Sequence, residues 1–70
     1  MKEILENEGW LYDSAEDRCE AYVKGIYDLW IYPQNKNRII IESEEFGVEV
    51  DGHIINKVHL LKLIKPFKKQ

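Results

Sequence analysis

The sequence predicts a single α+β domain over residues 1–70 that is mostly β. We expect a curved antiparallel meander of three to four strands, followed by a short C-terminal helix. Three observations predict it: apolar residues alternate at period two through residues 18–32, isoleucines fill 39–41, and apolar residues recur at helical spacing through 57–65. A small SH3-like β-barrel is the alternative, and it requires residues 57–65 to form a strand.

The first residues of the chain predict short elements. Residues 2–8 carry two adjacent apolar residues and form either a short helix or an edge strand, which Gly9 ends. Residues 10–12 are then expected to form a short strand. Residues 13–17 are polar, and we expect a hairpin loop there, with one helical turn as the alternative.

The longest predicted strand covers residues 18–32. Every odd-numbered residue from Cys19 to Ile31 is apolar or glycine, which is typical of a strand with one buried face. A straight strand of this length would extend about 50 Å at about 3.3 Å per residue. We therefore expect it to bend at Gly25, because glycine inside a strand commonly marks a bulge or bend. The opposite face then carries three aromatic residues, Tyr22, Trp30 and Tyr32.

The second half of the predicted sheet begins with a strand over residues 38–43. Beyond it the apolar residues change from odd to even positions, which indicates either a bulge or a tight turn into a further strand over 46–50. Asp51 and Gly52 form a hairpin dipeptide, so residues 53–55 are expected to pair back on that strand.

The predicted C-terminal helix has recognisable ends. Asn56 is a favourable N-cap residue, and Pro66 cannot continue a helix. The apolar residues between them recur at a spacing that places them on one broad face. These signals favour a helix over the strand that a barrel would need.

Composition restricts the class of protein. Hydrophobic residues make up 44% of the 70 residues, which predicts a folded core rather than a disordered chain. A single cysteine excludes an internal disulfide, and no apolar stretch approaches the ~20 residues of a membrane span. The N-terminus also lacks the apolar region of a signal peptide. We therefore expect a cytoplasmic protein with no membrane association.

The charges are segregated along the chain. The net charge is −3, yet residues 1–20 hold seven acidic residues against two basic ones, and residues 52–70 hold five lysines and no acidic residue. Such segregation affects partner choice and association rate rather than fold.

No motif in the sequence predicts catalysis. His53, His59 and Cys19 lack the short spacings of a zinc site, and neither Ser14 nor Ser43 lies in a glycine elbow. No phosphate-binding glycine loop or dinucleotide fingerprint is present. We therefore expect a non-enzymatic protein without cofactor or metal.

The predicted function is binding to another protein, as an inhibitor or adaptor of a larger assembly, a class that includes phage-type inhibitors of host defence. Exposed tryptophan and tyrosine side chains are the usual anchors of protein interfaces, and charges at the rim mainly steer association. The predicted partner-binding residues are the three aromatic residues and the charges of the adjoining turns: Tyr22, Trp30, Tyr32, Lys36, Arg38, Glu44 and Glu45.

Two other partners follow from the same features. The C-terminal lysines, combined with the exposed aromatic residues, would suit a nucleic-acid-binding domain, which is the alternative function. An open sheet edge would also allow two copies of the chain to pair as a homodimer.

Overall fold

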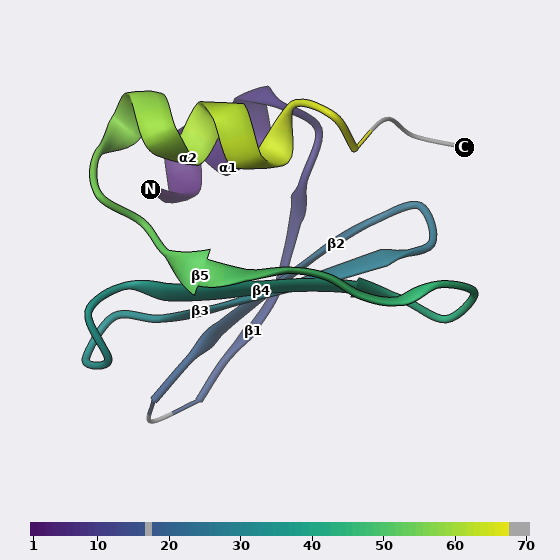
Figure 1. The fold of residues 1–70 in the computed structure, drawn as a ribbon, viewed down its shortest axis with the longest axis horizontal. Coiled ribbons are helices and arrows are strands. Elements are labelled where there is room, and N and C mark those ends of the chain that lie inside the picture. The colour runs from purple at the N-terminus through teal and green to yellow at the C-terminus, as the bar shows by residue number, and fades with distance from the viewer. Residues whose placement is uncertain (17, 68–70) are drawn as a thin grey trace.

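The computed structural model describes residues 1–16 and 18–67, which form a five-stranded antiparallel sheet with two helices on one face (Figure 1). The strands lie in the sheet in chain order, so the predicted α+β meander with a C-terminal helix is confirmed. The two outer strands do not pair with each other, and the sheet therefore stays open instead of closing into the alternative barrel. In chain order the elements are α1 (Lys2–Asn7), β1 (Leu11–Ala15), β2 (Glu20–Lys24), β3 (Tyr27–Tyr32), β4 (Arg38–Ser43), β5 (Gly47–His53) and α2 (Lys57–Ile64).

The predicted strand over residues 18–32 is in fact two strands, because the chain reverses at Gly25 and Ile26 instead of bending there. Gly25 has a φ of +59°, a left-handed conformation that glycine adopts at little cost. Lys24 and Tyr27, on either side of this turn, lie directly opposite each other in the β2–β3 ladder. The meander therefore has five strands where the sequence predicted three to four.

This turn sets which face each strand presents to the helices. Residues directly opposite each other in an antiparallel ladder have their side chains on the same face of the sheet. Tyr22 of β2 lies opposite Leu29 of β3, and both are fully buried. The predicted core face is therefore correct for β3 and wrong for β2, where Ala21 and Val23 lie on the opposite face.

The first two elements settle the alternatives at the N-terminus. The segment predicted over residues 2–8 forms the helix α1, which ends at Asn7, and its Leu5 side chain is buried. Strand β1 continues to Ala15, so most of the predicted hairpin loop is strand, with a register shift between Tyr12 and Ser14. Asp17, which belongs to the remainder of that loop, lies outside the described residues.

Strand β4 has the predicted bounds, and its connection and pairing with β5 contain both a bulge and a tight turn. The β4–β5 register shifts between Ile41 and Glu42, which is a bulge. The chain then turns between Ser43 and Gly47, where the Ser43 hydroxyl accepts a hydrogen bond from the Phe46 N–H at 2.9 Å. Both predicted features are present, but only the bulge changes the parity of the buried face: Ser43 lies opposite Gly47 before it, and Ile41 lies opposite Val50 beyond it. Val48, opposite Glu42, lies on the other face of the sheet.

The predicted hairpin at Asp51 and Gly52 is wrong. Both residues lie inside β5, where they are opposite Ile40 and Ile39 of β4. Gly52 does not adopt the positive φ that a hairpin turn of this kind requires. Instead of pairing back, the chain leaves β5 and crosses to α2 above the sheet (Figure 1).

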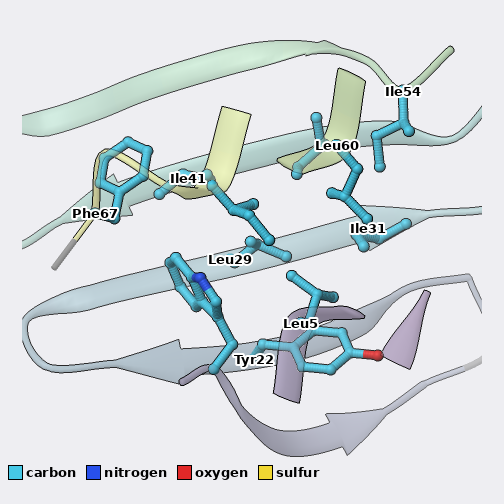
Figure 2. Packing of buried hydrophobic residues seen from close by; sticks show 11 residues of the cluster. Leu5, Tyr22, Leu29, Ile31, Ile41, Ile54, Leu60 and Phe67 are labelled. Carbon is cyan, nitrogen blue, oxygen red and sulfur yellow. The ribbon is translucent and has the colours of Figure 1, made fainter. Parts of the chain in front are cut away.

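The core fills the space between the sheet and the two helices (Figure 2). The Phe67 ring lies edge-on to two other aromatic rings, at centroid distances of 6.3 Å from Trp10 and 4.8 Å from Tyr27. These contacts join the segment after α2 to the segment after α1 and to β3, the middle strand of the sheet. Its buried members are Leu5, Trp10, Tyr22, Leu29, Ile31, Ile39, Ile41, Ile54, Leu60, Ile64 and Phe67.

Helix α2 has the predicted ends. The Asn56 side chain accepts a hydrogen bond from the His59 backbone N–H at 2.9 Å, which satisfies one of the N–H groups that the first helical turn leaves free. The helix ends at Ile64, two residues before Pro66.

Substitutions in the core strands should unfold the protein more easily than substitutions on the other face. We expect Leu29→Ala and Ile41→Ala each to lower the free energy of unfolding by ~2–5 kcal/mol, because both side chains are fully buried. Urea denaturation measures this, with Asp28→Ala on the opposite face of β3 as a control of little cost. Core variants as stable as the parent protein would contradict the assigned strand phase.

The cap of α2 provides a second test. Replacing Asn56 by Ala should lower the free energy of unfolding by ~1 kcal/mol, because the His59 N–H loses its acceptor. Asn56→Asp restores a side-chain oxygen and should recover most of the loss. Equal urea midpoints for the Ala and Asp variants would show that this cap does not stabilise the helix.

Candidate protein-interaction face

The face of the sheet opposite the helices has no covering layer among the described residues (Figure 1). The pairing registers place its side chains in rows that cross the strands. One row runs Leu11, Val23, Asp28, Glu42, Val48 from β1 to β5; the next runs Ser14, Ala21, Trp30, Ile40, Asp51; the third, over β3 to β5, is Tyr32, Arg38, His53. We refer to these residues as the open face.

The open face is richer in apolar side chains than a solvated sheet face normally is. Trp30 lies in the middle row between Ala21 and Ile40, and all three are half-buried. Leu11 and Val48, at the two ends of the first row, are 67% and 59% exposed. Antiparallel sheets with one wet face usually alternate apolar residues inward and polar residues outward. Here the outward positions of β2 to β4 hold an apolar group around Trp30 beside three charged residues, Asp28, Arg38 and Glu42.

The structure separates the three predicted aromatic residues. Trp30 and Tyr32 lie on the open face, where the sequence placed them. The prediction that Tyr22 joins them is wrong, because Tyr22 is fully buried on the helix side of the sheet. Its ring there contacts Tyr12 edge-on, at a centroid distance of 5.5 Å.

Of the predicted basic residues, Arg38 lies on the open face and is already paired. Its guanidinium donates two hydrogen bonds to the Asp51 carboxylate, at 3.0 and 2.9 Å. This contact raises the pKa of Arg38 and lowers the pKa of Asp51. Lys36 lies in the exposed turn between β3 and β4, with a φ of +54°.

The predicted acidic residues lie at the other end of β4. Glu44 and Glu45 are exposed in the turn between β4 and β5, whereas Arg38 begins β4. The predicted set therefore does not form one patch: Trp30, Tyr32 and Arg38 come together, and the two glutamates stand apart.

The sequence prediction missed most of the apolar part of the open face. Leu11, Val23, Ile40 and Val48 all belong to it. The signal for Ile40 was present, because three consecutive isoleucines in a strand cannot all point to one face. Val23 was missed because the turn at Gly25 and Ile26 was read as a bend.

Buried Tyr22 makes one polar contact on the helix side of the sheet. Its hydroxyl donates a hydrogen bond to Glu20 Oε1 at 3.0 Å. The pKa of Tyr22 is raised well above its ordinary value of 10.0, first because burial disfavours the phenolate and then because the hydroxyl donates to the Glu20 carboxylate. Tyr22 is therefore a neutral core residue that cannot contribute to the open face.

Three further features of the described residues bear on the sequence predictions. Within residues 1–16 and 18–67, no three metal-ligating side chains come together. A hollow beside Arg18, Cys19 and Tyr32 opens broadly to solvent, and Cys19 is a half-buried free thiol. In the same part of the chain, no helix has the length and apolar content needed to cross a membrane.

Comparison of the chain with protein-family models, with curated proteins and with solved structures gave no significant match. The open face is therefore the basis on which a function can be proposed.

Tyr22 should make the fold sensitive to alkaline pH. In the unfolded chain Tyr22 ionises near its ordinary pKa of 10.0, whereas in the folded protein it stays protonated to higher pH. The unfolded state thus binds fewer protons above pH 10, so the free energy of unfolding should fall there, with a limiting slope of about 1.4 kcal/mol per pH unit.

Urea midpoints measured across pH 8–12 test this expectation, with Tyr22→Phe as the matched variant because it keeps the ring and removes the ionisable group. The decline should be shallower in Tyr22→Phe than in the parent protein. Parallel declines in both would assign the alkaline sensitivity to other groups.

Proposed function

We propose that this protein acts by binding another protein through its open face, as a non-enzymatic inhibitor or adaptor in the cytoplasm. The observation that carries the proposal is the position of Trp30, which lies between Ala21 and Ile40 at the centre of a sheet face that no described element covers. Tryptophan is strongly enriched among the residues that dominate binding energy, and contiguous exposed apolar patches often mark interaction sites.

The geometry of the face suits docking of a partner surface. Tyr32 follows Trp30 on β3, so two aromatic side chains stand on the same strand and the same face. Leu11 and Val48 extend the apolar area toward the two outer strands. A broad sheet face of this kind presents a pre-formed surface, so little ordering entropy is lost when a partner binds.

Both histidines make local backbone contacts through Nδ1. His59 Nδ1 accepts a hydrogen bond from the Ile55 N–H at 3.0 Å. His53 Nδ1 lies 3.2 Å from the Lys36 carbonyl oxygen. These contacts stabilise a helix start and a turn, so a structural role accounts for both histidines.

The alternative, nucleic-acid binding by the C-terminal lysines and the aromatic residues together, is less well supported. Lys57, Lys62 and Lys65 are exposed on or beside α2, which lies on the helix side of the sheet (Figure 1). Trp30 and Tyr32 lie on the other side. A single-strand platform needs cations and stacking rings along one groove. Lys68 and Lys69 lie outside the described residues.

Replacing Trp30 tests the proposal. We expect Trp30→Thr to weaken binding of a partner by about 30-fold or more, the equivalent of about 2 kcal/mol. The fold should be retained, because threonine suits a half-buried strand position. The measurement is affinity capture from cells of the source organism, followed by titration of the purified pair.

Ile55→Thr is the matched control, because Ile55 is 80% exposed and lies next to α2 rather than on the open face. It should bind the partner as the parent protein does. Equal binding by Trp30→Thr, or a Trp30→Thr variant that is unfolded by urea denaturation and circular dichroism, would overturn the proposal.

A further inference from the structure

Two carboxylates lie directly opposite each other on the open face. Asp28 of β3 and Glu42 of β4 form a cross-strand pair, and both are half-buried. Like charges at directly opposite positions destabilise an antiparallel sheet. Within residues 1–16 and 18–67 neither carboxylate makes a side-chain hydrogen bond or ion pair.

The basic side chains of the neighbouring strand positions form contacts with other groups. Lys24, at the end of β2, lies on the helix side and donates a hydrogen bond to the Glu8 carbonyl oxygen at 2.6 Å. Arg38 is the only lysine or arginine of the open face, and it is paired with Asp51. Among the described residues of the open face, Asp51 therefore has a basic partner, whereas Asp28 and Glu42 have none.

Apolar side chains border this carboxylate pair. Val23 and Val48 are its neighbours in the same row, on β2 and β5. Trp30 and Ile40, each two residues away along β3 and β4, form the adjacent pair. A cation placed between the carboxylates would thus also contact the apolar centre of the open face.

We infer that the partner places an arginine or lysine side chain between Asp28 and Glu42, with apolar residues of the same segment on Trp30 and Ile40. This inference rests on the proposed function. A guanidinium suits the site best, because it binds carboxylates through a planar set of donors and also stacks on a tryptophan ring.

A second copy of the chain is a poorer occupant. Two open faces in contact would supply only their Arg38 side chains as cations, and each is already paired with Asp51. The outer strands also discourage edge pairing, since β1 is bulged and β5 carries Glu49 and Asp51.

The inference predicts opposite effects on stability and on binding. Asp28→Asn with Glu42→Gln removes the like-charge repulsion at nearly constant shape, so the urea midpoint of the free protein should rise. The same double variant should bind basic ligands more weakly. A loss of binding caused by unfolding would instead lower the midpoint.

The probe is a phage-displayed library of short random peptides, selected on the immobilised full-length protein. We expect peptides that combine arginine or lysine with aromatic or aliphatic residues, that bind Ile55→Thr normally and that fail to bind Trp30→Thr. For the best peptide, replacing its basic residue by Gln should weaken binding to the parent protein about tenfold, as for a charge-assisted hydrogen bond. The double variant should bind the original peptide and its Gln-substituted form almost equally.

The outcomes separate the inference from the proposed function. Two results would overturn the inference but not the proposed function. The selected peptides could depend on Trp30 yet contain no basic residue, or replacing the basic residue could weaken binding to the double variant as much as to the parent protein. Selected peptides that bind Trp30→Thr as well as the parent protein, or no selected peptides at all, would count against the open face as a docking surface. Sedimentation that shows a dimer, converted to monomer by Trp30→Thr, would identify a second copy as the occupant.

Discussion

The fold depends on one constraint: the two helices cover a single face of a five-stranded sheet. Helix α1 has six residues and α2 has eight, and both lie on the same side (Figure 1). Every large side chain that needs burial must therefore point to that side. Trp10, which follows α1, and Phe67, which follows α2, pack there edge to face. No described element covers the second face of the sheet, and this is the face to which we assign the proposed partner.

Elements with local signals could be predicted from the sequence. Strand β4 is a β-branched run bounded by turn residues, and α2 lies between a capping Asn56 and Pro66. These signals act within a few residues and need no knowledge of the neighbouring strands. They were sufficient to predict the α+β fold class and the order of the strands in the meander.

The phase of β2 could not be predicted in the same way. A two-residue turn places Lys24 opposite Tyr27, so an odd residue on one strand shares a face with an even residue on the next. Alternation of apolar residues continues through such a turn without interruption, and the pattern cannot tell a bend from a reversal. Tyr22 was consequently assigned to the wrong face, and Val23 was missed. The Asp28–Glu42 pairing likewise depends on the register between strands, which one strand's sequence does not contain.

The strand order has a consequence for how the protein reaches its native state. Each strand pairs with its neighbour in the chain, so the sheet can assemble from successive hairpins with short loop closures. The core is completed only when α2 and Phe67 dock against α1 and Trp10, a contact between segments far apart in sequence. We therefore expect sheet formation to precede helix docking, with closure of the core as the slow, entropy-limited event.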